Sequence, residues 1–310
     1  MWKLIIPLIL LFSSCAQGFR YSQFLSRWQN EKNSAHYIEN VPFFKQSAHQ
    51  CGPSALASVL AYYKKSDANP EKIANEIILS GSNGTLNLEM LLYPRRSGLI
   101  TEMVNNDFEN IKKLIRKGYP VILLIDDGFL FFHSPHYIVL IGFDEKENLF
   151  IAHWGIEPNR VIRDSSLRKK WERAGGWGFV AMELSEEEIT PEQHNNMGVA
   201  YEDAGKLREA EHEYLRAISK KKDFCEPLFN LGNICYKNGN LKKAEQWYLN
   251  ALSRCEKKGD IYNNLAYLYM KMNNIIKAIE NIQKALSLDP ENMEYLDTRA
   301  EIYKKRLPSP

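Results

Sequence analysis

Polar and apolar residues in the first half of the chain follow helical spacing first and strand spacing later. An apolar run that begins at Cys51 predicts a helix. A second helix is predicted at Asn69-Pro70, because an N-cap residue there precedes a proline at the first helical position. A third helix is predicted to begin at Asp107 and to stop at Gly118.

Four short apolar runs follow these helices, at 120–126, 137–143, 149–154 and 177–184. Short apolar runs rich in β-branched and aromatic residues predict strands. The second and third runs are joined by the polar turn 144–148, which predicts a hairpin. Helices first and antiparallel strands afterwards indicate an α+β domain, which we place at residues 41–185.

The C-terminal third of the chain repeats its small and large residues every 34 positions. Tyr214, Tyr248 and Ile282 share one position of the repeat. Small residues occupy three further sets, which are Gly198, Gly232, Ala266 and Ala300; Ala210, Ala244 and Ala278; and Ala217, Ala251 and Ala285. This period resembles the tetratricopeptide repeat, a helix–turn–helix unit. The resemblance predicts an all-α solenoid over residues 191–307, with three units and a capping helix.

The start of the chain has one lysine, an apolar run of about ten residues and small residues before Cys15. This run is too short to span a bilayer, so it predicts a secretory signal at residues 1–14. The sequence Phe12-Ser13-Ser14-Cys15 resembles the bacterial lipobox, in which the cysteine becomes the lipidated first residue. The resemblance implies a lipid-anchored protein of the bacterial cell envelope, on the outer membrane or the periplasmic face of a membrane. An ordinary secretory signal cleaved nearby is the alternative, and residues 15–40 are expected to be a tether and lead-in.

The composition of the 310-residue chain is that of a globular protein, with 45% hydrophobic and 25% charged residues. A net charge of +2 gives no reason to expect nucleic-acid binding. Cys225, Cys235 and Cys255 match no metal-site spacing and, being odd in number, form a poor disulfide framework. We expect them to be small buried residues of helices, and we expect no metal or cofactor.

Cys51 is the residue that most strongly indicates chemistry. It precedes Gly52-Pro53 at the start of a predicted helix, where backbone N–H groups and the helix dipole favour a thiolate. Gln46 lies five residues earlier and offers a side-chain donor for an oxyanion, and the less favoured alternative is Gln50.

The candidate base is a histidine next to an apolar run. His136 stands one residue before the predicted strand 137–143, at an end from which a side chain can reach a cleft. His133 competes with it, but its position before Pro135 predicts a loop. The order Gln46, Cys51, His136 fits the papain-type arrangement of a cysteine on a helix and a histidine on a later strand.

Two blocks carry a resemblance to a known family, VPFFKQSAHQCGPSALASVLAYY at 41–63 and HYIVLIGFDEKENLFIAHW at 136–154. They resemble the bacteriocin-processing, double-glycine peptidases in the broad sense, over about residues 41–182. The resemblance implies a papain-like fold and a Cys-His-Asp triad. It gives Gln46, Cys51 and His136 the roles of oxyanion donor, nucleophile and base. The repeats and the lipobox-like start make the chain similar to a lipoprotein branch of this family.

The third member of the triad departs from the family's pattern. The family usually has Asp-Pro one strand after the histidine, but this chain has His153-Trp154 there. His153 is the leading candidate to orient His136, as in peptidases with a Cys-His-His set. Asp144 and Asn159 are the other candidates, although Asp144 also suits a turn residue that caps its own backbone.

The chain is therefore predicted to be an exported, lipid-anchored cysteine peptidase whose repeats recruit a protein partner or substrate. Its substrate would be a peptide or protein, its membrane contact the lipid anchor, and nucleic acid would not be a partner. The absence of Asp-Pro keeps open a catalytically impaired, peptide-binding scaffold of an envelope complex. A hydrolase or transferase acting on cell-wall peptide or small amides is a third alternative.

Overall fold

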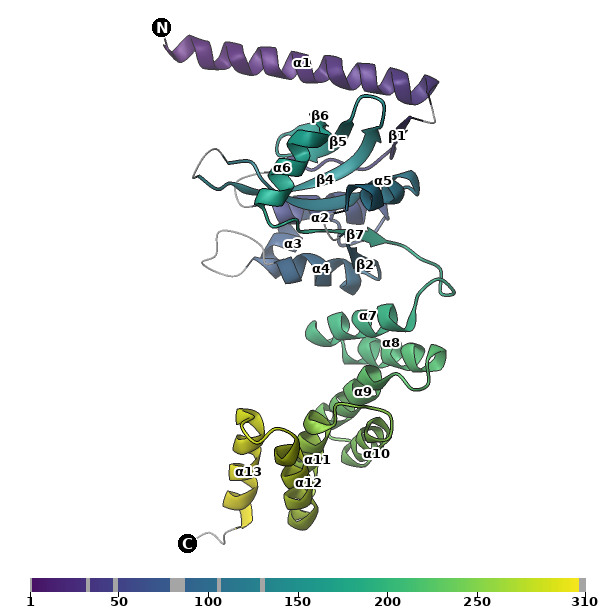
Figure 1. Cartoon of the computed structure of the whole chain (residues 1–310), viewed down its shortest axis with the longest axis vertical. Coiled ribbons are helices and arrows are strands. Elements are labelled where there is room, and N and C mark those ends of the chain that lie inside the picture. The colour runs from purple at the N-terminus through teal and green to yellow at the C-terminus, as the bar shows by residue number, and fades with distance from the viewer. Residues whose placement is uncertain are drawn as a thin grey trace. The chain divides into compact units, whose positions relative to one another are not determined.

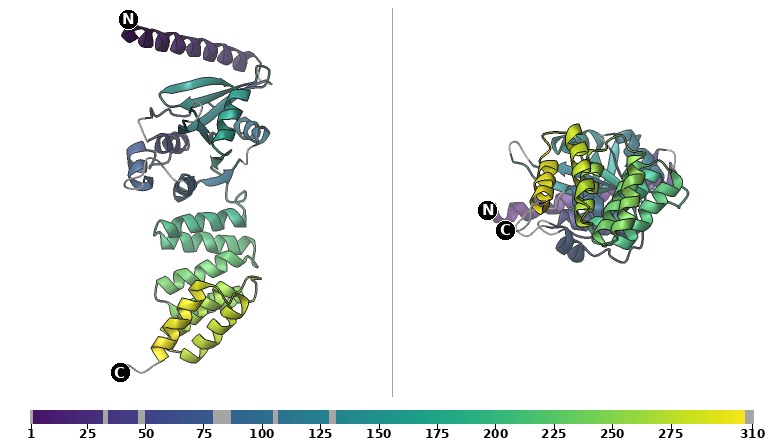
Figure 2. Two further views of the ribbon diagram at one scale, coloured as in Figure 1. Left: turned by 60° about the vertical axis from the view of Figure 1, so that its left-hand side comes forward. Right: turned by 90° about the horizontal axis from the view of Figure 1, so that it is seen from below.

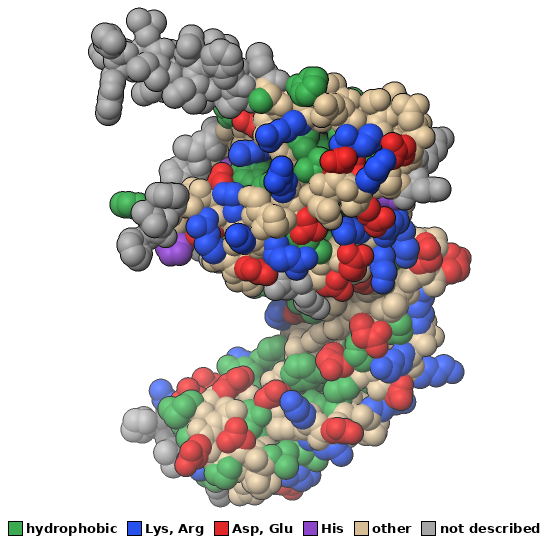
Figure 3. All heavy atoms as spheres, turned by 45° about the horizontal axis from the view of Figure 1, so that its top comes forward, with side chains coloured by type: hydrophobic (Ala, Val, Ile, Leu, Met, Phe, Trp, Pro, Cys, Tyr) green, Lys and Arg blue, Asp and Glu red, His purple; other side chains and the backbone are tan. Residues whose placement is uncertain are grey.

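The computed structural model describes residues 2–31, 34–46, 50–78, 87–104, 107–128 and 132–306, without the side chains of residues 2–15 and 306. The chain forms two compact units, residues 1–184 and 185–310. No helix in the described ranges is both long and apolar enough to cross a membrane. Acidic and basic side chains are mixed on the face drawn in Figure 3, in keeping with the small net charge.

The first unit is built on a seven-stranded antiparallel sheet (Figure 1). The strand order is β2-β7-β3-β4-β5-β6, and β1 pairs with β4. The strands are β1 Ala35–Tyr37, β2 Ile100–Met103, β3 Val121–Asp126, β4 Pro135–Asp144, β5 Leu149–Trp154, β6 Glu157–Arg163 and β7 Gly178–Met182. The predicted α+β domain and its β4–β5 hairpin are confirmed.

Six helices of the described chain belong to this unit. They are α1 Trp2–Asn30, α2 Cys51–Tyr62, α3 Pro70–Ile77, α4 Asn87–Arg96, α5 Phe108–Arg116 and α6 Asp164–Arg173. In Figure 1, α2 lies behind the sheet and packs against β4, whereas α5 and α6 lie in front of it. Phe108 of α5 stacks on Trp171 of α6 with ring centroids 5.3 Å apart, which joins the two front helices.

Local sequence signals explain where these helices begin and end. The side chain of Asn69 accepts a hydrogen bond from the backbone N–H of Lys72, and Asp107 accepts one from Glu109. Each interaction satisfies a helix N–H group that has no intrahelical partner. After α5 the chain turns at Gly118, whose φ of +83° a residue with a Cβ rarely adopts.

The first unit extends beyond the lower boundary that the sequence suggested. Phe24 of α1 is fully buried, its ring lies 5.9 Å from that of Tyr37, and Arg27 Nε donates to Asp144 Oδ2 over 2.6 Å. Gln17 accepts a hydrogen bond from the backbone N–H of Val161 in β6. Much of the expected tether, residues 15–40, is therefore folded onto the sheet. Cys15 lies in α1, but its side chain is outside the described part.

The second unit consists of three antiparallel helix pairs and one further helix (Figure 2). The pairs are α7 Pro191–Asp203 with α8 Leu207–Lys220, α9 Cys225–Lys237 with α10 Leu241–Leu252, and α11 Gly259–Lys271 with α12 Ile275–Leu288; α13 is Met293–Arg306. The predicted helical solenoid is confirmed.

The 34-residue period reflects close packing inside each pair. A Cβ on Gly198 would lie 2.5 Å from the ring of Tyr214, and one on Gly232 would lie 2.4 Å from that of Tyr248. Both tyrosines are buried, so neither ring has free space into which it can move. A small residue at this position therefore permits the large one 16 residues later.

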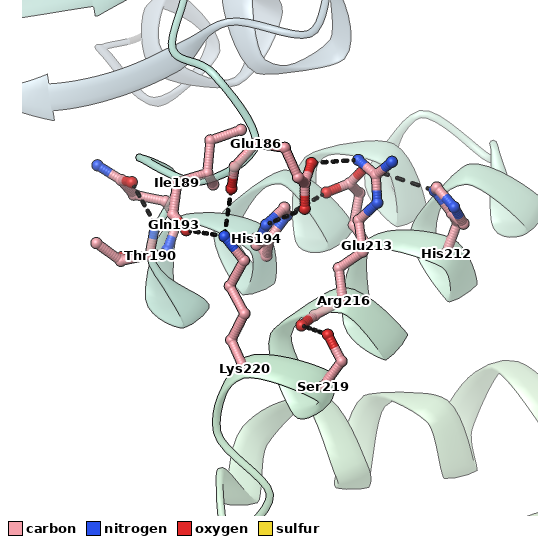
Figure 4. A network of polar contacts seen from close by, with 10 residues as sticks. All are labelled: Glu186, Ile189, Thr190, Gln193, His194, His212, Glu213, Arg216, Ser219 and Lys220. Carbon is pink, nitrogen blue, oxygen red and sulfur yellow. Dashed lines mark hydrogen bonds and ion pairs between the residues drawn. The ribbon is translucent and has the colours of Figure 1, made fainter.

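A polar network fastens residues 185–190, which precede α7, to the first helix pair (Figure 4). His194 is fully buried; its Nδ1 lies 2.7 Å from Glu213 Oε2 and its Nε2 lies 3.2 Å from Glu186 Oε1. Arg216 Nη1 lies 3.0 Å from Glu186 Oε2, and Lys220 donates to the carbonyl of Ile189 over 2.7 Å. Two helices thus hold the segment that follows the first unit.

The cysteines of the second unit correct one expectation. Cys225 and Cys255 form a disulfide with their Cα atoms 5.2 Å apart, across 30 residues of sequence. Only Cys235 of the three is a free, buried residue, as expected for all of them. An odd number of cysteines does not prevent two of them from pairing. Cys225 begins α9, and the chain comes back to it at Cys255, just after α10.

Loss of this disulfide is expected to destabilise the second unit by about 2–4 kcal/mol, because the link restricts a loop of the unfolded chain. Chemical denaturation followed by circular dichroism, with and without reductant, measures the difference. In the Cys225→Ser/Cys255→Ser double variant, reductant is expected to leave the unfolding midpoint unchanged. An identical unfolding midpoint for the native protein in both conditions would contradict the prediction.

Candidate active site

Cys51 is the first residue of α2, and the nine residues that follow it are all buried. Every residue from Gly52 to Leu60 is buried, whereas Cys51 itself is partly exposed. The side chain of Gln50, the residue before the helix, forms no capping hydrogen bond with it, and Pro53 brings no N–H group. The N–H groups of Cys51 and Gly52 belong to this helix start, where the helix dipole favours negative charge.

The end of β4 lies next to this helix. Tyr137 is buried, and its hydroxyl donates to Asn87 Oδ1 over 2.6 Å. Burial raises the pKa of this phenol, and the nearby Cys51 raises it further. Helix α2, which begins at Cys51, packs against β4, in which His136 precedes Tyr137.

Gln46 is fixed between two strands. Its Nε2 donates to the carbonyl of Tyr137 over 3.3 Å, and its Oε1 accepts from the N–H of Gly155 over 3.2 Å. The backbone N–H of Gln46 donates to the carbonyl of Gly155 over 3.0 Å. Since an amide nitrogen carries two hydrogens, one donor of Gln46 is left for a ligand. Gln46 therefore binds the first residues of β4, and α2, which begins at Cys51, packs against the same strand; residues 47–49 lie outside the described chain.

His136 borders a cavity of about 280 Å³. The cavity is lined by Asp127, Ser134, His136, Trp154, Gly155, Ile156, Glu157 and Arg160. Burial lowers the pKa of His136; the carboxylate of Asp127 opposes this shift, and the guanidinium of Arg160 adds to it. The imidazole is therefore neutral at neutral pH, which is the form that accepts a proton.

One ring nitrogen of His136 has no partner. Its Nε2 is buried and forms no hydrogen bond with any described residue. The position that a Cβ would take on Gly155 is 3.7 Å from this nitrogen, so the ring edge lies against that backbone. A buried nitrogen of this kind is a place where a hydrogen-bonding group is expected.

None of the three candidate orienting residues fills that place. His153 Nε2 lies 2.9 Å from the carbonyl of Val41, and its Nδ1 is buried without a partner among the described residues. Asp144 binds Arg27 at the opposite end of the ten-residue strand β4. At about 3.3 Å per residue, that end is more than 20 Å from His136.

Asn159 is also occupied elsewhere. Its Oδ1 accepts a hydrogen bond from the hydroxyl of Tyr37 over 3.3 Å, on the side of the unit where α1 packs. Its backbone has a φ of +57°, a left-handed conformation that asparagine tolerates in turns. Asn159 therefore serves the strand β6 and its neighbours rather than His136.

The charged groups around His136 were missed by the sequence reasoning. Asp127 follows β3, forms an ion pair with Lys170 of α6, and acts on His136 from the preceding strand rather than from the following one. Arg173 donates to the carbonyl of Asp126 over 2.6 Å and so holds the same loop. The sequence held only two separate signals of this arrangement, the adjacent Asp126 and Asp127 and the basic residues of α6.

The competing base, His133, has its own partner. Its Nδ1 lies 2.7 Å from Asp126 Oδ2, while its side chain remains mostly exposed. Hydrogen bonds from the N–H groups of Ser134 and Gly128, with that of His133, hold the pKa of Asp126 far below its usual range. The loop thus presents a second imidazole, oriented by a carboxylate, at the same end of the sheet.

The site suits acyl transfer by a thiol. It combines a cysteine at a helix start with an amide donor and a neutral imidazole at the start of β4, the strand against which that helix packs. Within the described ranges, no group of three or more His, Cys, Asp or Glu residues is arranged to hold a metal ion.

Comparison with known proteins identifies both parts of the chain. Residues 38–179 match the Peptidase_C39 like family. Residues 195–258 and 259–292 match tetratricopeptide repeat families. These matches confirm the predicted peptidase-family domain and the predicted repeats. No curated protein sequence matches the chain.

Similar solved structures fall into the same two groups. A C39-like peptidase from Bacillus anthracis covers 49% of this chain and 100% of its own, at 16% identity and a TM-score of 0.43. Pseudomonas aeruginosa pilF covers 38% of this chain and 55% of its own, at 21% identity and a TM-score of 0.36. A tetratricopeptide repeat protein from Parabacteroides merdae covers 38% and 46%, at 22% identity and a TM-score of 0.36.

The charges near His136 predict opposite effects on its pKa. Asp127→Asn is expected to lower the pKa of His136, because the neutral amide no longer stabilises the imidazolium. Arg160→Gln is expected to raise it, because a repelling cation is removed. Titration of the His136 ring signals by NMR measures both variants. Equal titration curves for the two would show that neither charge acts on the imidazole.

Proposed function

Since the chain carries a C39-like peptidase domain followed by tetratricopeptide repeats, we propose that it is a cysteine peptidase whose repeats recruit a protein partner or substrate. The observation that carries this proposal is Cys51, partly exposed at the start of a helix whose next nine residues are buried and which packs against β4, the strand that bears His136.

The proposed reaction is hydrolysis of a peptide bond. His136 takes the thiol proton, and the thiolate of Cys51 attacks the peptide carbonyl to form a tetrahedral oxyanion. The free hydrogen of the Gln46 amide and the N–H of Cys51 stabilise that oxyanion. His136 then gives its proton to the leaving amine, and water resolves the thioester to release the acid and restore the thiol.

A second function is favoured by one observation. His136 Nε2 has no hydrogen-bond partner among the described residues, and His153 is turned to Val41 instead. Without an orienting group the imidazole is a weaker base. The alternative is thus a catalytically impaired domain that binds peptides and acts as a scaffold of an envelope complex.

We further propose that the protein is exported and anchored by lipid at Cys15. The lipobox-like sequence before Cys15 supports this, and so does the Cys225–Cys255 disulfide, because such bonds persist in oxidising compartments. Lipidation would hold the protein at a membrane surface without a spanning helix.

Alkylation of Cys51 by iodoacetamide separates peptidase from scaffold. In a Cys15→Ser/Cys235→Ser background, the only remaining free thiol is Cys51, because the disulfide does not react. Labelling at pH 6–7 is expected to be at least about tenfold faster than for an unperturbed thiol, since only the thiolate reacts. His136→Ala is expected to remove most of this advantage, whereas His133→Ala is the matched control and keeps it. A labelling rate that rises only near pH 8.5 and ignores His136 would leave the scaffold as the function.

The anchor is tested in a bacterial host. Cys15→Ser is expected to move the protein from the membrane fraction to the aqueous fraction, and Cys51→Ser is expected to leave it in the membrane. Mass spectrometry of the mature N-terminus should find Cys15 as a lipidated first residue. An unlipidated terminus elsewhere would indicate an ordinary secretory signal.

A further inference from the structure

The repeat unit contains a cavity of about 410 Å³ between alternate helices. Its walls come from the first helix of the second and third pairs, α9 and α11, and from α13, with Tyr248 of α10 as the remaining contributor. The volume falls within the range of about 300–1,000 Å³ that is usual for ligand sites. The residues of α13 in this lining are mostly acidic, whereas those of α11 include two asparagines, and both sets indicate which ligand would bind.

The α13 wall is acidic. Glu294, Asp297 and Glu301 line the cavity at helical spacings of three and four residues, so they share one face. None of the three forms an ion pair with a described residue. Other glutamates of this unit are paired, for example Glu202 with Lys237 at 2.8 Å and Glu211 with Lys243 at 2.8 Å.

The α11 wall holds an unpaired acceptor. Asn263 has only 3% of its surface exposed, and its Nδ2 donates to Glu294 Oε1 over 3.3 Å. Its Oδ1 is buried and has no hydrogen-bond partner among the described residues. Leaving a buried acceptor unpaired destabilises the folded protein. A donor that enters the cavity would remove this destabilisation.

The rest of the cavity adds amide groups and aromatic surface. Asn233 Oδ1 accepts from Tyr248 over 2.7 Å and from Asn264 over 2.8 Å. The rings of Tyr236 and Tyr267 meet edge to face with centroids 6.1 Å apart. The cation in the lining, Lys237, is already paired with Glu202, so it does not neutralise the acidic wall.

We propose that this cavity binds a lysine or arginine side chain of an extended segment of a partner polypeptide. This inference rests on the proposed recruiting role of the repeats and specifies the chemical group that they would recognise in a partner. The cationic head would meet Asp297 and Glu301 and donate to Asn263, while its aliphatic stem lies along the tyrosine rings. A polypeptide is the favoured source because the neighbouring asparagine amides offer both donors and acceptors to a peptide backbone.

The test uses the full chain and four acetylated, amidated peptides, Gly-Ala-Ala-X-Ala-Ala-Gly, in which X is lysine, arginine, norleucine or glutamate. Ligand-observed NMR titration measures each Kd. The lysine or arginine peptide is expected to bind at least about tenfold more tightly than the norleucine peptide, since a charge-assisted hydrogen bond is worth about that factor. Equal binding of all four peptides, or no binding of the cationic ones, overturns the proposal.

Three variants sharpen the test. Asp297→Asn is expected to weaken the cationic peptide at least about fivefold, and Asp297→Lys to abolish its binding, whereas Glu291→Gln, outside the cavity lining, is the matched control. Thermal melting confirms that each variant is folded. Displacement of the lysine peptide by an equimolar amount of spermidine would overturn a polypeptide as the occupant.

Alkylation of Cys51 in the same samples keeps the two proposals apart. Fast labelling with no peptide selectivity overturns the cationic cavity and leaves the peptidase function standing. Selective peptide binding with an inert Cys51 supports the cavity and removes the peptidase function. Asp297→Asn is expected to leave the labelling rate unchanged.

Discussion

Burial of helix α2 is the constraint on which the first unit depends. Nine consecutive residues, Gly52 to Leu60, are buried, so the helix cannot slide or rotate without opening the core. Small residues make this possible, because Gly52, Ala55 and Ala57 allow close approach of neighbouring elements. A helix fixed in this way also fixes its first residue. The packing of α2 thus fixes the position of Cys51. Cys51 is partly exposed because it precedes the first buried residue of the helix.

The long strand β4 carries this constraint to the rest of the sheet. It pairs with β3, β5 and β1, and it places His136 at one end and Asp144 at the other. Gln46 binds the same end through Tyr137, while Arg27 of α1 binds the opposite end. The two ends therefore have separate contacts: one carries His136 and binds Gln46, and the other holds the lead-in helix.

Sequence patterns predicted what depends on local order and missed what depends on pairing in space. The caps at Asn69 and Asp107, the hairpin and the 34-residue period are local, and the structure contains them. The disulfide and the Asp127–Lys170 pair join residues 30 and 43 positions apart, and no spacing rule selects them. The edge strand β6 was missed because its residues Glu157–Arg163 are mostly polar.

For the candidate site, the helix and strand that hold Cys51 and His136 were predictable, but the surroundings of the imidazole were not. The family pattern led to His153, yet the pairing of β4 with β5 sets His153 opposite Val139, three residues beyond His136. Its ring is then free to reach Val41.

In a serine protease, replacing the aspartate that orients the histidine lowers the rate about 10⁴-fold. Under the proposed function, Asp127 offsets part of such a loss, because its charge favours the imidazolium even without a hydrogen bond. Recruitment by the repeats would offset more, because a bound substrate meets the site at an effective concentration of about millimolar. Under the proposed function, a slow thiol site and a repeat array would be complementary, because the array would make weak chemistry sufficient for the substrates that it holds.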